Sequence, residues 1–229
     1  MSEEFKRTEA LIGKAKMERL KRSKVIIFGV GGVGSYVCEA LARAGIGTLE
    51  LVDSDTVDIT NINRQIIALH STVGRLKAEA AAERIRDINP AAEVICRCCR
   101  YTPENSGDFD FGSFDYAVDA VDDVRAKISI IEESKKAGTP VISSMGTGNK
   151  IDPSAFRVAD IEDTKICPLA RAVRRELRKR RISGVKTVYS EEAPENDGGQ
   201  SGPPASISFV PAAAGLLIAK AVIDDLLKE

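Results

Sequence analysis

Hydrophobic and polar positions follow two periods from Lys24 to about Ser143. Short apolar runs, typical of buried strands, take turns with longer segments whose apolar residues recur every three or four positions. These patterns predict strands at 25–28, 48–52, 94–99, 116–120 and 140–143, and helices at 35–44, 77–88 and 124–137. Parallel strands joined by right-handed crossover helices form a doubly wound sheet. The chain is therefore predicted to have an α/β, Rossmann-like core with a mainly parallel sheet.

The pattern loses its regularity after about Gly146. We expect an irregular C-terminal extension with β-structure in a second layer, its strands at 156–159, 185–189 and 206–210. A stretch rich in charge, Gly and Pro predicts a mobile loop at 190–206. Pro211 can begin a closing helix over 212–227. The expected parts are an N-terminal helical arm that contacts a second copy (1–23), the core (24–145) and the extension (146–229).

Composition adds few constraints on partners. The chain has 229 residues, 43% apolar and 29% charged, which is enough for a sizeable core. A net charge of −1 creates no global attraction to nucleic acid or membrane, so any RNA contact needs a local patch. The N-terminus lacks a signal peptide, and the longest apolar stretch, 209–219, is too short for a bilayer. Five cysteines without paired spacing suit a reducing cytoplasm, the expected location.

A glycine-rich turn follows the first strand, in the segment VIIFGVGGVGS. Gly29, Gly31 and Gly34 have the GxGxxG spacing, with Gly32 as an extra glycine. Glycines allow a tight turn and close backbone approach, and the N–H groups at the start of the next helix can bind phosphate. Asp53 ends the second strand, where a carboxylate can bind ribose hydroxyls. The turn predicts a nucleotide site, with a ligand-free turn as the alternative.

The fingerprint alone does not identify the nucleotide. A nicotinamide-dependent dehydrogenase needs a proton relay, and this chain offers little for one. Its single histidine, His70, lies in a polar stretch, and none of its four tyrosines is followed by lysine four residues later. Hydride transfer is disfavoured, while a nucleotide-binding module without catalysis stays an alternative.

A polar cluster follows the second strand and another follows the fourth. Arg64 and Lys77 can neutralise a triphosphate and the charge that develops on pyrophosphate. Asp122 is a candidate Mg²⁺ ligand, because this ion takes one or two carboxylates together with phosphate oxygens. The predicted nucleotide contacts in these clusters are Asp55, Asn61, Asn63, Arg64, Gln65, Lys77 and Asp122.

GVGGVG, LVDSD, NINRQ, Lys77 and DAVDD together resemble the nucleotide site of the ThiF/MoeB group, the ubiquitin-activating-enzyme-like adenylyltransferases. The resemblance implies ATP with Mg²⁺, attack of a carboxylate on the α-phosphate and release of pyrophosphate. It assigns Asp53 to the ribose, Arg64 and Lys77 to the phosphates, and Asp122 to magnesium. It also implies that Arg7, in FKRTEALIG, reaches the active site of a partner subunit in a homodimer.

The cysteines bear on which carboxylate is activated. Relatives that adenylate ubiquitin-like proteins commonly carry two CxxC zinc pairs and a nucleophilic cysteine in a loop. This chain has neither, so no zinc is expected and thioester or persulfide chemistry is disfavoured. Cys96, Cys98 and Cys99 are predicted to be buried on a strand. Cys167, near a helix start, is expected to have a packing role.

Arg and Lys make up most of the segment from Arg171 to Arg181. On a helix, Val173 and Leu177 would face inward and the cations would face outward. The exposed face is either simply solvated or binds the phosphate backbone of RNA, and physical reasoning leaves both open. The candidate tRNA-binding residues are Arg171, Arg174, Arg175 and Arg178.

Further motifs resemble the tRNA threonylcarbamoyladenosine dehydratase branch of the same group. They are NRQIIALHSTVG, AERIRDINP, SSMGTGNKIDPS and a CPLA…RREL helix followed by VYSEE. The resemblance implies a tRNA substrate whose threonylcarbamoyl carboxylate is adenylated and then cyclised with release of AMP. The chain after Glu192 departs from that branch, being short and without a cysteine before VYSEE. The alternative is activation of a ubiquitin-like sulfur-carrier protein, with a sulfur-relay or sulfur-carrier protein as partner.

Overall fold

The structure is a computed structural model that describes residues 3–195 and 204–228. Its described residues form a seven-stranded sheet in the order β3-β2-β1-β4-β5-β7-β6. The strands are β1 (Lys24–Phe28), β2 (Thr48–Val52), β3 (Glu93–Arg97), β4 (Tyr116–Asp119), β5 (Val141–Ser144), β6 (Phe156–Asp160) and β7 (Lys186–Ser190). Neighbouring strands are parallel except β6 and β7. The order reverses between β1 and β4, which confirms the doubly wound prediction.

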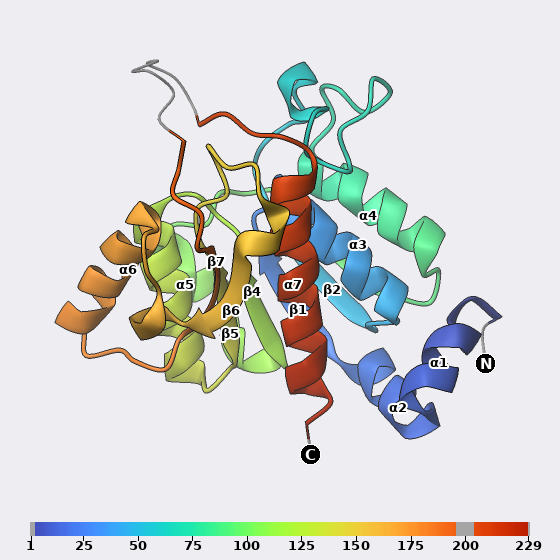
Figure 1. Cartoon of the computed structure of the whole chain (residues 1–229). Coiled ribbons are helices and arrows are strands. Elements are labelled where there is room, and N and C mark those ends of the chain that lie inside the picture. The colour runs from blue at the N-terminus through green and yellow to red at the C-terminus, as the bar shows by residue number, and fades with distance from the viewer. Residues whose placement is uncertain (1–2, 196–203, 229) are drawn as a thin grey trace.

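Helices cover both faces of this sheet (Figure 1). Along β1, Val25 and Ile27 face one apolar core while Ile26 and Phe28 face the other. The first core packs against α3 (Gly34–Ala44), α4 (Lys77–Ile88) and α7 (Phe209–Leu226), and the second against α5 (Val124–Ala137) and α6 (Pro168–Lys179). Two shorter helices, α1 (Lys6–Ile12) and α2 (Lys14–Arg22), precede β1. None of the described helices has the length and apolarity needed to cross a membrane.

The C-terminal part differs from the prediction in two ways. The strands β6 and β7 extend the main sheet instead of forming a second layer, because β7 pairs in parallel with β5 and satisfies its backbone groups. The run 206–210 is not a strand, since α7 begins at Phe209. A short apolar run suits either element, and Pro211 in the first turn fits a helix.

Other expectations hold at the level of whole elements. The helices predicted at 77–88 and 124–137 match α4 and α5. Val173 and Leu177 are fully buried on α6. Residues 196–203 of the loop predicted at 190–206 lie outside the described residues, and the boundaries of the three parts stay predictions.

Candidate functional site

A cavity of about 960 Å³ opens at the carboxyl ends of β1 and β4, where the strand order reverses. Ligands of open α/β sheets bind at this position because the loops on either side diverge there. Most residues predicted to contact a nucleotide line it. They are Gly29, Gly31, Gly32, Asp53, Asp55, Asn61, Arg64, Gln65, Lys77 and Asp122.

The glycines of the turn have two different roles. Gly29 has a φ of +87°, and a Cβ there would lie 2.7 Å from the Ala120 carbonyl oxygen. A Cβ at Gly34 would overlap the carbonyl oxygen of Gly29, so Gly34 serves the packing of the turn. A Cβ at Gly31 would meet only the Gln65 side chain, at 3.9 Å. The backbone at Gly31 is therefore open to the cavity, where a phosphate can approach the start of α3.

Asp53 follows β2 and joins its end to the glycine turn. Its Oδ2 accepts a hydrogen bond from the Val30 amide at 2.7 Å, and its Oδ1 accepts one from the Asp55 amide at 2.8 Å. These bonds hold the carboxylate in one orientation at the cavity wall. Each oxygen keeps a further lone pair, which is compatible with the predicted bond to ribose.

Lys77 is the first residue of α4, and its side chain is only 9% exposed. Its Nζ forms an ion pair with Asp55 Oδ2 at 2.8 Å, and the Asp55 side chain is 66% exposed. The ammonium thus has a carboxylate partner that belongs to the protein. An ammonium has three donors, so a phosphate in the cavity can share it.

The turn after a 3₁₀ helix, η2 (Ile59–Asn61), presents Arg64 at the cavity. The Asn61 side chain is buried and completes a capping box with Asp58, so it shapes this turn. Arg64 donates to the Asn63 side-chain oxygen at 2.9 Å. Among the described residues the guanidinium has no ion pair with a carboxylate, which leaves its charge available to a ligand.

Gln65 and Asn63 have contrasting surroundings. Gln65 is buried at the cavity, and its Oε1 has no hydrogen-bond partner among the described residues. Buried polar atoms are nearly always paired, so this oxygen indicates a missing donor. The Asn63 side-chain Nδ2 instead donates to the Ser206 carbonyl at 3.0 Å, which connects the segment before α7 to the turn that carries Arg64.

Two aspartates at the end of β4 also differ in their surroundings: Asp119 is its last residue, and Asp122 follows it. Asp122 is exposed at the cavity, and no group of three or more His, Cys, Asp or Glu gathers as a metal site in the described chain. Asp119 is fully buried and accepts from Lys127 Nζ at 3.1 Å and from the Ser143 hydroxyl. Lys127 also donates to the Ser144 carbonyl at 2.7 Å, so the pair joins β4, α5 and β5. The sequence did contain a sign of this pair, because Lys127 lies on the apolar face of the helix predicted at 124–137.

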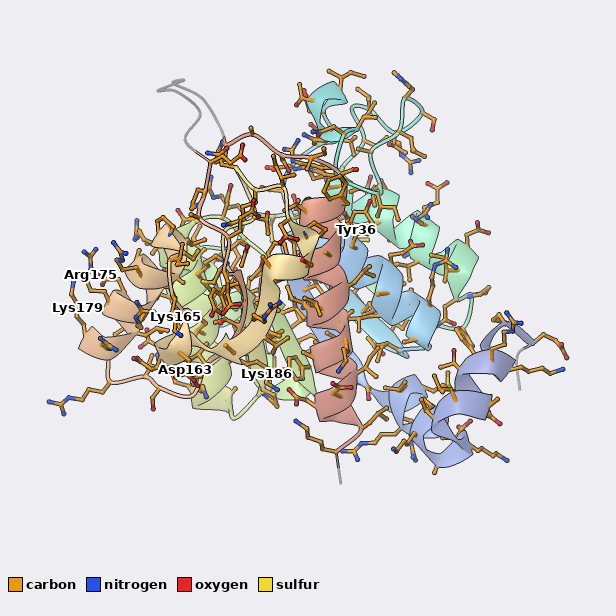
Figure 2. All side chains as sticks on the ribbon, in the orientation of Figure 1. Tyr36, Asp163, Lys165, Arg175, Lys179 and Lys186 are labelled. Carbon is orange, nitrogen blue, oxygen red and sulfur yellow. The ribbon has the colours of Figure 1, made fainter. Side chains whose placement is uncertain are left out.

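The arginines of α6 divide between the protein and the solvent. Arg174 is half-buried and donates to two carbonyl oxygens of the loop before the helix, at 2.8 and 3.2 Å. Arg178 pairs with Glu162, with 2.9 Å between Nε and Oε2. Arg171 and Arg175 are exposed, as Arg178 is; Arg175 lies 3.7 Å from the Glu176 carboxylate of the same helix, and Figure 2 labels it on the outer side of α6. The four candidate tRNA contacts are therefore not equivalent.

The cysteines correct one prediction. Cys98 is exposed, because β3 ends at Arg97 and forms an edge of the sheet. Cys96 and Cys99 are only half-buried. Desolvation raises the pKa of the Cys96 and Cys98 thiols above the ordinary value, which disfavours the thiolate form. Cys167 is buried at the N-cap of α6 and lines the cavity, in agreement with a packing role.

Arg7 is exposed on α1, away from the cavity of its own chain. The ring of Phe5, just before α1, lies beside Gly45, which ends α3. The cavity lies at the other end of α3, and a helix of 11 residues spans ~16 Å. Any contact of Arg7 with a nucleotide would have to come from a second copy of the chain.

Comparison with known proteins explains the motifs that gather at the cavity. The model of the ThiF family matches residues 5–229. The chain belongs to the ThiF family. The tRNA threonylcarbamoyladenosine dehydratase of Bacillus subtilis is 46% identical, over 100% of this chain and 96% of that protein. The Escherichia coli protein of that name is 38% identical, over 85% of this chain and 76% of its own.

Solved structures of ThiF relatives agree with the fold. The E. coli tRNA threonylcarbamoyladenosine dehydratase in complex with ATP superimposes with a TM-score of 0.92 at 34% identity, covering 98% of this chain and 93% of that one. A more distant relative is the adenylyltransferase and sulfurtransferase UBA4 of Candida glabrata, 36% identical over 58% of this chain and 30% of its own.

The cavity has a second wall, and none of its residues was predicted to be a site residue. It consists of the loop after β5 and the start of α6, with lining residues Ser144, Met145, Gly146, Thr147, Gly148, Asn149, Lys150, Cys167, Pro168 and Leu169. Because β5 ends at the same sheet edge as β1 and β4, the loop after it borders the cavity. The motifs SSMGTGNKIDPS and CPLA contain these residues, but their positions along the chain did not show that they border the cavity.

Proposed function

We propose that this chain is an ATP-dependent tRNA threonylcarbamoyladenosine dehydratase. It adenylates the carboxylate of the threonylcarbamoyl group on the tRNA adenosine next to the anticodon, and ring closure then releases AMP. The supporting observation is the match to dehydratases along the whole chain, together with a cavity whose glycine turn and cations suit a triphosphate. The ATP complex of the E. coli relative supports the choice of nucleotide.

The first wall of the cavity consists of the glycine turn, Asp53, Arg64, Gln65 and Lys77, and these residues suit ATP. The glycine turn offers N–H groups to the phosphates, and Asp53 offers its oxygens to the ribose. Arg64 and Lys77 neutralise the triphosphate and the charge that develops on pyrophosphate as it leaves. Gln65 Oε1 can accept a hydrogen bond from the nucleotide. Asp122, together with phosphate oxygens, would hold Mg²⁺, which shields the phosphate charge.

The reaction divides into two steps. A carboxylate oxygen attacks the α-phosphorus of ATP, and the bond from that phosphorus to pyrophosphate breaks. A nucleophile of the same threonylcarbamoyl group then attacks the activated carbonyl carbon and loses its proton, while the bond to AMP breaks. One carboxylate oxygen leaves with AMP, so the tRNA loses one water overall. The cavity residues bind and orient both reactants, and no thiol of the protein is needed.

Two contributions would come from outside the cavity. Arg7 of a second copy would add a cation to the phosphates, in a homodimer formed through residues 1–23. Arg171 and Arg175 on α6 would bind the tRNA backbone, while Arg174 and Arg178 hold the helix through their internal partners. A tRNA substrate is consistent with a cytoplasmic location.

The second candidate is an adenylyltransferase that activates a ubiquitin-like sulfur-carrier protein. The similarity to UBA4 favours it, although that match covers 58% of this chain. Both candidates share the ATP chemistry and differ in the acceptor of the adenylyl group.

The deciding experiment supplies the protein with ATP, Mg²⁺ and bulk tRNA and analyses the nucleosides by mass spectrometry. We expect threonylcarbamoyladenosine to lose one water, with AMP and pyrophosphate released in equal amounts. The Lys77→Ala variant is the control for a contaminating activity. Unchanged tRNA, with pyrophosphate released only after a sulfur-carrier protein is added and AMP retained on that protein as an adenylate, would replace the first candidate by the second.

A further inference from the structure

Lys150 is a buried cation on the second wall of the cavity, with 4% of its surface exposed. It lies in the loop after β5. Arg64 and Lys77 lie beyond β2, and in the sheet β2 and β5 are separated by β1 and β4. Lys150 is therefore placed apart from the cations assigned to the triphosphate.

The ammonium of Lys150 has no carboxylate partner in residues 3–195 and 204–228. Its Nζ donates to the backbone carbonyl of Glu192. The Glu192 carboxylate is engaged elsewhere, because it accepts from the amides of Ile151 and Asp152 at 2.9 and 3.0 Å. Burial lowers the pKa of Lys150 below its ordinary value, and the nearby Cys167 and Glu192 offset this only in part.

The start of α6 adjoins the same part of the cavity. Cys167 and Leu169 line it, and Cys167 makes no side-chain cap to the helix. Pro168 has no N–H and the Arg171 amide donates to the Cys167 carbonyl, so the free donors at the positive end of the helix dipole are the amides of Leu169 and Ala170. A Cβ at Gly146 would lie 3.8 Å from the Cys167 sulfur, so the loop that carries Lys150 packs against this helix end.

Asn149 fixes the backbone beside Lys150. Its N–H donates to the Ala205 carbonyl at 2.8 Å, and its Oδ1 accepts from the Ala205 amide at 2.7 Å. Its carbonyl accepts from the Glu195 amide at 2.7 Å. Lys150 is thus held between two chain segments, and its position is set without a ligand.

We propose that Lys150 and the free amides of α6 bind the carboxylate of the acceptor, which deepens the proposed function and rests on it. A buried ammonium that forms no ion pair, as Lys150 among the described residues, is costly, and a ligand anion supplies such a partner. The triphosphate has Arg64 and Lys77 on the other wall. One ammonium beside helix amides matches a single carboxylate, and Met145 and Leu169 offer apolar surface to the threonyl methyl group.

The test compares the Lys150→Met variant with wild type in three binding measurements. The ligands are ATP, a tRNA transcribed in vitro, and the same tRNA carrying threonylcarbamoyladenosine. Lys165→Met is the matched control, because Lys165 is an exposed lysine shortly before α6 and loses the same charge outside the cavity lining.

We expect wild type and Lys165→Met to prefer the modified tRNA. Lys150→Met should lose this preference by on the order of 10- to 100-fold, the range for a hydrogen bond to a charged group, with unchanged ATP affinity. The ATP measurement also reports folding. If Lys150→Met does not fold, Lys150→Gln decides in its place, since an amide can still donate to the Glu192 carbonyl. A Gln variant with a weakened preference supports the proposal, and one with the wild-type preference refutes it.

The remaining outcomes separate the two proposals. A wild-type preference that survives in Lys150→Met removes the carboxylate subsite and leaves the dehydratase proposal standing. A loss of ATP affinity in Lys150→Met would assign Lys150 to the nucleotide instead. If wild type shows no preference for the modified tRNA and leaves it unchanged, both proposals are wrong.

Discussion

The two walls of the cavity treat positive charge differently. On the first wall the buried Lys77 is paired with Asp55, although the half-buried Arg64 has no carboxylate partner among the described residues, and beneath the cavity Lys127 is paired with Asp119. On the second wall the buried Lys150 has, within residues 3–195 and 204–228, a carbonyl oxygen as its partner and no carboxylate. Removing one member of a buried pair leaves the other charge uncompensated, whereas removing an unpaired buried cation eliminates an uncompensated charge. The fold thus supplies a carboxylate to the buried Lys77, whereas among the described residues it supplies none to the buried Lys150.

The largest expected effect on stability follows from breaking the Lys127–Asp119 pair. Lys127→Met leaves a carboxylate with no exposed surface and no counter-ion, so unfolding free energy should fall by about 3–5 kcal/mol. Denaturant unfolding measures this loss. The double variant Asp119→Asn with Lys127→Met should recover a large part of it, and equal losses in the single and double variants would contradict the account.

The next effect concerns ATP turnover at the first wall. Lys77→Ala and Arg64→Ala each remove a cation from the departing pyrophosphate, so AMP formation should slow by about 10²–10³-fold. Lys220→Ala, which removes an exposed lysine of α7, is the control. Rates are measured with modified tRNA and saturating ATP. Turnover within a factor of two of wild type would show that the phosphates lie elsewhere.

A smaller effect distinguishes Lys150 from Lys127. The pKa of Lys150 is lowered in the folded state, so the unfolded chain binds its proton more tightly. Wild type therefore gains stability from this group as pH rises toward the ordinary lysine pKa. Lys150→Met without ligand should be at least as stable as wild type near neutral pH, and its advantage should shrink at alkaline pH. Thermal unfolding from pH 7 to pH 10 measures both, and a destabilised variant at pH 7 would favour a purely structural role.

The smallest effect concerns α6. Arg171→Glu and Arg175→Glu should weaken tRNA binding and lower the slope of log affinity against log salt by about one for each phosphate that the helix no longer neutralises. Arg174→Glu should instead reduce stability, because that side chain is bonded to the loop before the helix. Filter binding at several salt concentrations and thermal unfolding separate these results. A helix that is only solvated would leave the salt slope unchanged.

The first wall could be predicted from the sequence because its residues lie close together along the chain. The glycine turn, Asp53, Arg64 and Lys77 fall within about two βα units, and local spacing places them at one sheet edge. Lys150 could not be predicted in this way. Its burial depends on Glu192 and on Ala205, which packs against the neighbouring Asn149, and sequence spacing does not reveal such contacts.

The sequence by itself determined the α/β class, the order of its strands and helices up to Ser143, and a nucleotide site with cations. Those features depend on periodicity and on neighbours in the chain. Only the tertiary structure decided that β7 joins β5, that Arg174 and Arg178 are engaged internally, and that Lys150 lacks a counter-ion among the residues the structure describes. Whether a charge is paired depends on segments brought together by folding, so this difference between the two walls cannot be read from the sequence alone.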